Sequence, residues 1–166
     1  MAVQFVLGGA RSGKSRYAES LVERHRGPWV YLATAEAFDD ELRARIAIHR
    51  ERRSDGWVTR DVPLDLAVAL QAAGPAPVLV DCLTLWLTNL MLGGHDPEAA
   101  TKALLAALAA RSGPTVLVSN EVGLGIVPEH ALARRFRDAA GVLHQRIAGV
   151  ADSVVLMVAG IAMRVK

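Results

Sequence analysis

Residues 8–15 have the types and spacing of a phosphate-binding loop. They are, in order, Gly8, Gly9, Ala10, Arg11, Ser12, Gly13, Lys14 and Ser15. The run fits G-x-x-x-x-G-K-[ST] without a gap. Glycines let backbone N–H groups turn toward phosphate oxygens, the lysine reaches the outer phosphates, and the final hydroxyl can ligate Mg²⁺. The pattern predicts a nucleotide phosphate site, although a glycine-rich turn that happens to carry Lys and Ser fits the same letters.

A carboxylate ends the apolar run "PVLVD" at residues 77–81. Phosphoryl transfer needs an acidic side chain at the end of a buried strand to hold the magnesium shell, and Asp81 is placed for that role. An aspartate at this position could equally cap the next helix. Thr84 and Asn89 follow in an otherwise apolar stretch. They are either hydrogen-bonded core groups or site groups, and the sequence leaves both open.

A histidine lies in the arginine-rich segment 39–53, whose spacing predicts a helix. On that helix Leu42, Ile46 and His49 share one stripe. Arg45 and Arg53 lie four residues before and after His49, and their charge would favour neutral imidazole. A neutral imidazole between guanidinium groups is what a nucleophile attacking a nucleotide phosphate requires. A lone histidine on an apolar stripe is also commonly a packing residue.

The other candidates for chemistry have weaker arguments. Among the remaining histidines no pair has metal-ligand spacing with a third ligand, so we expect no zinc site. The single cysteine, Cys82, excludes an internal disulfide and a cysteine-built zinc site, which suits a cytoplasmic protein. We expect this thiol to be a buried small apolar group rather than a nucleophile.

Predicted strands and predicted helices alternate along the chain and position these residues. Apolar runs typical of strands covered on both faces occupy residues 3–7, 29–33, 77–81, 115–119 and 153–159. Helical spacing occupies residues 15–26, 39–53, 64–73, 97–111 and 129–148. The alternation predicts an α/β fold with a mostly parallel sheet flanked by helices. We expect residues 1–166 to form one nucleotide-binding catalytic domain, with its ligands at the carboxyl ends of the strands.

Composition limits the classes of partner. The chain has 166 residues, 52% of them hydrophobic, and a net charge of +2 without a long block of like charge. Aromatic residues are 5% of the chain and do not interleave with the basic segment, so we expect no nucleic-acid partner. No apolar run reaches the roughly 18 residues of a membrane span.

Four segments together resemble a known family. They are "GGARSGKSR" (8–16), "YLATAEAFDDELRARIAIHRERR" (31–53), "VDCLTLWLTNL" (80–90) and "SNEVGLGIVPE" (119–129). In this order they resemble the bifunctional adenosylcobinamide kinase / adenosylcobinamide-phosphate guanylyltransferase of cobalamin biosynthesis. The similarity continues through residues 136–148 and 158–166, so it covers essentially the whole chain.

The resemblance implies a P-loop NTPase fold of the RecA-like kind and two reactions. The first phosphorylates the hydroxyl on the aminopropanol arm of adenosylcobinamide, with ATP or GTP as donor and Mg²⁺ as cofactor. The second transfers GMP from GTP to adenosylcobinamide phosphate through a covalent guanylyl-histidine, whose histidine aligns with His49. The resemblance also implies a homotrimer.

The nucleotide contacts that the resemblance implies fall on several segments. They are Gly8 through Ser15, the strand end Ala33, Thr34 and Ala35, the run Arg50, Glu51, Arg52 and Arg53, and the acidic residues Asp61 and Asp81. Ser15 and Asp81 would hold the magnesium ion, and His49 and Lys14 would be catalytic. Ser54 and Asp61 depart from the Pro and Glu that the family often has. The shorter carboxylate weakens the expected contact at Asp61.

Two other functions fit the phosphate loop. An ordinary P-loop small-molecule or nucleotide kinase would use the loop and Asp81 but give His49 no covalent role. A nucleotide-dependent switch ATPase would hydrolyse nucleotide and modify no small molecule. A protein that carries label from α-labelled GTP on His49 would distinguish the guanylyltransferase from both.

Overall fold

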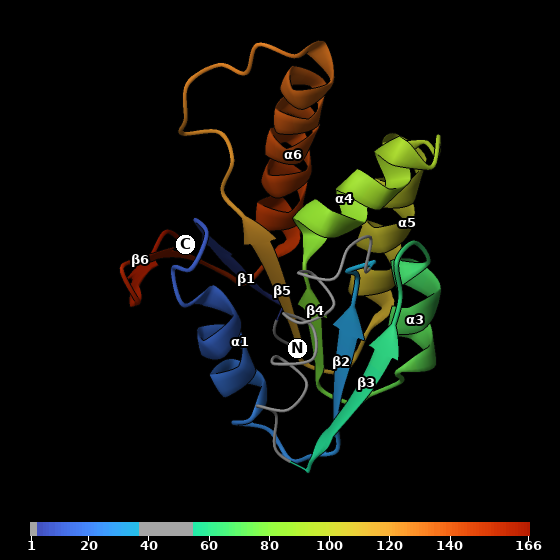
Figure 1. The fold of residues 1–166 in the computed structure, drawn as a ribbon. Coiled ribbons are helices and arrows are strands. Elements are labelled where there is room, and N and C mark those ends of the chain that lie inside the picture. Colours follow the sequence, from blue (N-terminus) through green and yellow to red (C-terminus); the bar gives the residue numbers. More distant parts are fainter. Residues whose placement is uncertain (1–2, 37–54) are drawn as a thin grey trace.

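The computed structural model describes residues 3–36 and 55–166 (Figure 1). The elements, in chain order, are β1 (Val3–Gly8), α1 (Lys14–Val22), β2 (Trp29–Ala33), β3 (Trp57–Asp61), α3 (Leu66–Ala72), β4 (Val78–Asp81), α4 (Leu83–Leu92), α5 (Pro97–Ala110), β5 (Thr115–Asn120), α6 (Ala131–Val150), β6 (Ser153–Val158) and β7 (Ile161–Arg164). Strands and helices alternate through most of this order, as the sequence predicts.

The strands form a single sheet in the described residues, in the order β3-β2-β4-β5-β1-β6-β7. Every neighbouring pair is parallel except β6 and β7, which are antiparallel. The prediction of a mostly parallel sheet is confirmed. Because parallel strands end at one edge, the residues that follow β1, β4 and β5 gather at the same carboxyl edge.

Helices cover both faces of this sheet, which explains the continuously apolar strands. Successive strand residues point to opposite faces, so Phe5 and Val6 of β1 belong to different cores. Val6 packs in the core that contains Ala18 and Leu21 of α1. Phe5 packs in the larger core, to which α3, α4, α5 and α6 contribute their buried side chains. Figure 1 shows α1 on one side of the sheet and these helices on the other.

Four predicted helices are confirmed, with boundaries shifted by a few residues. The predicted segments 15–26, 64–73, 97–111 and 129–148 correspond to α1, α3, α5 and α6. The start of α5 follows the predicted mechanism: Pro97 is at the first position and an Asp96 carboxylate oxygen accepts from the Glu98 N–H at 2.9 Å. The predicted helix 39–53 lies outside the described residues. Within the residues described, no helix combines the length and apolar character needed to cross a bilayer.

Three elements were not predicted from the sequence. α4 is apolar on nearly every side, with six of its residues buried, so it lacks the contrast that a periodic pattern needs. β3 is an edge strand with half-buried and exposed side chains, and β7 is an exposed edge strand. The turn before β7 consists of Ala159 and Gly160, both with positive φ, and alanine seldom indicates such a turn.

Candidate active site

The phosphate loop connects the end of β1 to the start of α1. Arg11 and Gly13 have φ values of 53° and 90°, and Gly13 occupies the N-cap position of α1. A positive φ of this size is available to glycine without steric cost, which explains Gly13. The Nζ of Lys14, a residue only 9% exposed, donates to the carbonyl oxygen of Gly9 at 2.9 Å. The ammonium group of Lys14 is therefore held inside the loop, at the N-terminus of α1, where the helix dipole is positive.

Ser12 lies at the base of this loop. Its hydroxyl is buried and has no hydrogen-bond partner among the described residues. A Cβ atom at Gly8 would lie too close to that hydroxyl and tightly against Met157, so a side chain at this position would displace its neighbours. The carbonyl oxygen of Ser12 accepts from the Gly160 N–H at 3.0 Å. The turn between β6 and β7 thus supports the phosphate loop from the side, a contact that the sequence did not predict.

Asp81 is the last residue of β4 and is half-buried. Its Oδ2 accepts from the Tyr31 hydroxyl at 2.8 Å, and the N-cap position of α4 is occupied by Cys82. The carboxylate is therefore oriented by β2 rather than used as a helix cap. β5 lies between β4 and β1, so one strand separates Asp81 from the phosphate loop.

The strand end of β2 is fixed by a buried hydrogen-bond network. The Thr34 hydroxyl donates to the Cys82 carbonyl at 2.7 Å and accepts from the Cys82 N–H at 2.8 Å. Asn89 donates from Nδ2 to the carbonyl oxygens of Thr34 and Pro63 at 2.8 and 3.1 Å. Asn89 is thus a satisfied core group that holds the end of β2. Of the predicted contacts here, Ala33 and Thr34 are buried and Ala35 is half-buried.

Asp61 lies far along the same edge. It is the last residue of β3 and pairs in register with Ala33. β3 is four strand spacings from β1, or about 19 Å at the usual separation. The structure therefore does not bring Asp61 to the phosphate loop. A nucleotide held by the loop would reach Asp61 only with the part of the molecule farthest from its phosphates.

Asn120 and Glu121 also lie at this edge, and the sequence did not identify them as site residues. Asn120 ends β5 opposite Gly8 in the register, and the Glu121 N–H donates to the Gly8 carbonyl at 3.0 Å. Asn120 also donates from Nδ2 to the Thr84 hydroxyl at 3.0 Å, which gives Thr84 a partner. An apolar run that ends in Asn-Glu is the same signal that identified Asp81. Glu121 therefore contacts the first residue of the phosphate loop through its backbone, while its carboxylate accepts from the Gly123 N–H.

A buried Ser–His pair lies behind this edge. His144 of α6 shares a hydrogen bond of 2.8 Å between its Nε2 and the hydroxyl of Ser119 in β5. Burial lowers the pKa of His144, and the negative charge of Glu121 opposes that shift. The imidazole is therefore held neutral and packs beside the Phe5 ring. It fixes α6 to β5 and has no exposed face toward the phosphate loop, since both residues are buried.

Cys82 has the character that the sequence predicts. The side chain is buried, and burial together with the charge of Asp81 raises the pKa of its thiol to about 11. A thiol with this pKa stays protonated at neutral pH and is a poor nucleophile.

Comparison with known proteins decides the family. Residues 4–165 match the family described as cobinamide kinase / cobinamide phosphate guanyltransferase. The chain belongs to this family. It is therefore an enzyme of a kinase and guanylyltransferase family, as the resemblance in the sequence predicted.

Two curated relatives are similar over nearly their whole length. The bifunctional adenosylcobalamin biosynthesis protein CobP of Pseudomonas aeruginosa is 49% identical, and the match covers 97% of this chain and 95% of that protein. The bifunctional adenosylcobalamin biosynthesis protein CobU of Salmonella typhimurium is 44% identical, with 97% and 98% covered.

A solved structure supports the fold. The chain is similar, at 12% identity and a TM-score of 0.54, to an ATPase of a type III secretion system from pathogenic bacteria. The match covers 93% of this chain but half of that ATPase chain. At this identity the likeness bears on the P-loop fold alone.

Part of the predicted site lies outside the residues that the structure describes. His49 and the contacts predicted at Arg50, Glu51, Arg52 and Arg53 fall there. The described structure brings together the phosphate loop, Glu121 and, one strand away, Asp81.

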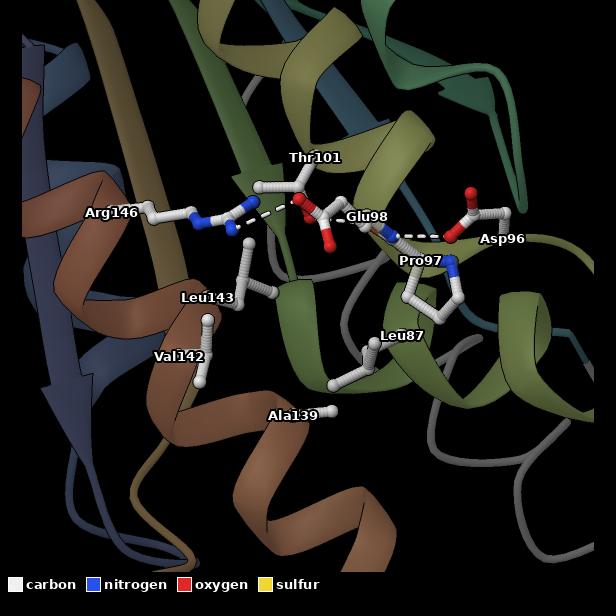
Figure 2. Close-up of a pocket in the computed structure, with 9 residues that line it drawn as sticks. All are labelled: Leu87, Asp96, Pro97, Glu98, Thr101, Ala139, Val142, Leu143 and Arg146. Carbon is white, nitrogen blue, oxygen red and sulfur yellow. Dashed lines mark hydrogen bonds and ion pairs between the residues drawn. The ribbon is translucent and has the colours of Figure 1, made fainter.

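A cavity of about 260 Å³ lies elsewhere, between α4, α5 and α6 (Figure 2). At one side Arg146 donates to Glu98 at 3.3 Å. These helices cover the sheet face opposite α1, so the cavity is not part of the phosphate site.

Proposed function

We propose that this chain performs two successive transfers on a corrinoid. It phosphorylates the arm hydroxyl of adenosylcobinamide with ATP or GTP, and then transfers GMP from GTP to the phosphate, giving adenosylcobinamide-GDP and pyrophosphate. The observation that carries the proposal is a complete phosphate loop, folded between β1 and α1, in a member of this family.

The loop would hold the outer phosphates of the nucleotide in both steps. Its backbone and the N-terminus of α1 provide positive potential, and Lys14 is buried in the loop, with its ammonium group on the Gly9 carbonyl. Phosphate oxygens are stronger acceptors than this carbonyl, so nucleotide binding would draw the ammonium onto them. In the kinase step, the acceptor hydroxyl releases its proton to solvent and its oxygen bonds to the γ-phosphorus, while the bond from that phosphorus to the β-phosphate oxygen breaks. Lys14 then stabilises charge on the transferring group.

The second step uses the same cradle for the leaving group. A ring nitrogen of His49 attacks the α-phosphorus of GTP, the bond to the β-phosphate oxygen breaks, and pyrophosphate leaves. An oxygen of adenosylcobinamide phosphate then attacks the guanylyl phosphorus and releases the imidazole. The arginines on either side of His49 in the sequence support this role, because they favour a neutral imidazole and neutralise phosphate charge.

Ser15 and Asp81 fit a magnesium ion bound together with nucleotide. Ser15 is in the first turn of α1, directly after Lys14, and Asp81 offers a half-buried carboxylate oriented by Tyr31. Magnesium is usually bound by one or two protein oxygens together with phosphates and water, so this small set is sufficient. The ion would neutralise charge on the phosphates during transfer.

Three further features of the proposal concern the domain, the location and the oligomeric state. We infer that residues 1–166 act as one catalytic domain, since α1 and the helices of the opposite face share one sheet. The single cysteine supports a cytoplasmic location. The family resemblance supports a homotrimer.

Labelling with α-labelled GTP tests the covalent step. We expect the purified protein to acquire label that is stable in alkali and labile in acid, as a phosphoramidate is. His49→Ala should acquire none, while retaining the circular dichroism and thermal transition of the wild type. A wild-type protein that phosphorylates adenosylcobinamide but never carries label would instead be an ordinary P-loop kinase.

A further inference from the structure

The loop between β5 and α6, residues 121–130, exposes large aliphatic side chains. Leu124, Ile126 and Val127 are 85%, 98% and 60% exposed. From Val122 to Val127 the loop contains only valine, glycine, leucine and isoleucine, so this stretch has no side-chain charge. Concentrated exposure of this kind marks binding surfaces more often than plain solvent-facing loops.

The loop is held with these side chains outward. Val122 packs against the larger core and the Gly123 N–H donates to the Glu121 carboxylate, which fixes the start of the loop. Arg134 of α6 donates from its guanidinium to the carbonyl oxygens of Pro128 and Glu129, which fixes the end. The aliphatic side chains therefore project from a segment anchored on both sides. Figure 1 shows this segment arching away from the sheet above the end of β5.

The segment that carries the exposed residues starts next to the phosphate loop. The Glu121 N–H donates to the carbonyl of Gly8, the first residue of that loop, at 3.0 Å. Leu124 lies three residues later. An acceptor whose hydroxyl meets the γ-phosphate must therefore extend its remaining bulk over the carboxyl edge that this loop borders.

The chemistry of the surface selects between the two substrates of the proposed reaction. The triphosphate group of a nucleotide is strongly charged, so an uncharged aliphatic surface does not favour its binding. A corrin ring is a broad, flat macrocycle with methyl groups and neutral amide arms on its rim. Its apolar area can cover Leu124, Ile126 and Val127, and its amides can reach the backbone at Gly123 and Gly125. The cavity between α4, α5 and α6 is a poor alternative, because it lies on the opposite face from α1.

We propose that the exposed aliphatic residues of the 121–130 loop, which starts next to the phosphate loop at Glu121, form the docking platform for the corrin ring of the acceptor. This inference rests on the proposed function and adds to it the surface that selects the substrate. The platform serves both steps, since adenosylcobinamide and its phosphate carry the same ring.

The test compares the double variant Leu124→Ser/Ile126→Ser with Val68→Ser. Val68 is 63% exposed on α3 and so controls for loss of an exposed aliphatic group elsewhere. Binding of adenosylcobinamide is measured directly by quenching of tryptophan fluorescence. Steady-state kinase kinetics and labelling by α-labelled GTP without corrinoid are measured in parallel.

For the double variant we expect Kd and KM for adenosylcobinamide to rise by about tenfold or more, with kcat nearly unchanged. Labelling by GTP and the values for Val68→Ser should match the wild type. Unchanged corrinoid binding in the double variant would overturn the proposal that this loop binds the corrin ring.

Light scattering on the same proteins tests the competing occupant, a second copy of this chain. A smaller oligomer in the double variant, with corrinoid affinity falling only as the oligomer dissociates, would assign the loop to a subunit interface and overturn the platform. A wild-type protein that neither binds nor phosphorylates adenosylcobinamide would instead refute the proposed function itself.

Discussion

The ammonium group of Lys14 donates a hydrogen bond of 2.9 Å to the carbonyl oxygen of Gly9, inside the loop that both residues help to form. The lysine is only 9% exposed, so the loop holds this charge in place before any nucleotide binds. Exchange of the Gly9 carbonyl for phosphate oxygens needs little movement of the backbone. This preorganisation is what makes a lysine effective toward charge that develops on a phosphoryl group.

Lys14→Ala should impair both proposed reactions, because both use the same phosphate cradle. We expect a fall in kcat of about 10²-fold or more in the kinase assay and in guanylyl transfer. His49→Ala should abolish guanylyl transfer and leave phosphorylation of adenosylcobinamide within a few-fold of wild type. The two assays use γ-labelled ATP and α-labelled GTP. Loss of kinase activity in a folded His49→Ala protein would refute this division of roles.

Arg111→Met should destabilise the protein strongly. The buried guanidinium of Arg111 donates to the Thr115 hydroxyl at 2.9 Å and to the carbonyl oxygens of Leu70 and Ala76. Its removal leaves three acceptors without this partner, and we expect the free energy of unfolding to fall by about 2–4 kcal/mol. Urea titration measures the change. Arg135→Met, at an exposed position of α6, is the matched control and should change stability by less than about 0.5 kcal/mol.

His144 should make the protein less stable in mild acid. Burial lowers its pKa in the folded state. Between the lowered and the ordinary pKa, the unfolded chain therefore binds a proton at this histidine and the folded chain does not. Stability is therefore unaffected by this group above the ordinary pKa of about 6.5 and decreases as the pH falls below it. We expect the wild type to lose up to about 1.4 kcal/mol more per pH unit than His144→Gln between pH 6.5 and the lowered pKa. Parallel pH dependences in urea titrations of the two proteins would contradict this effect.

Cys82 should resist alkylation in the folded protein. Burial and the charge of Asp81 raise the pKa of its thiol to about 11, so the reactive thiolate is scarce at pH 8. We expect iodoacetamide to modify the native protein far more slowly than the protein in urea, as followed by mass spectrometry. Equal rates in the two conditions would show that the thiol is accessible.

The strands of this fold were predictable because helices cover both faces of the sheet. The runs at residues 3–7 and 77–81 are mostly apolar, and they became β1 and β4 nearly residue for residue. The same burial explains why α4 was not predicted. Its residues are apolar on nearly all sides, so its sequence lacks the periodic alternation that indicates a helix. β3 and β7 lie at the sheet edges, where exposed side chains remove the apolar signal.

The sequence predicted those parts of the candidate site that a local sequence pattern defines. The phosphate loop has a fixed spacing, and Asp81 ends an apolar run. The sequence left Thr84 and Asn89 open, because their partners lie on β5 and directly after β2, far away in the chain. The support of Ser12 by Gly160 joins residues almost 150 positions apart, and no local pattern encodes such a contact.

A chase of the labelled protein tests whether the chain passes a guanylyl group from GTP to the corrinoid through a covalent intermediate. The wild-type protein is incubated with α-labelled GTP, freed of nucleotide, and mixed with adenosylcobinamide phosphate in a single turnover. We predict that label leaves the protein and appears in adenosylcobinamide-GDP at a rate no slower than steady-state turnover. Label that stays on the protein, or that is released only as GMP, would contradict the account.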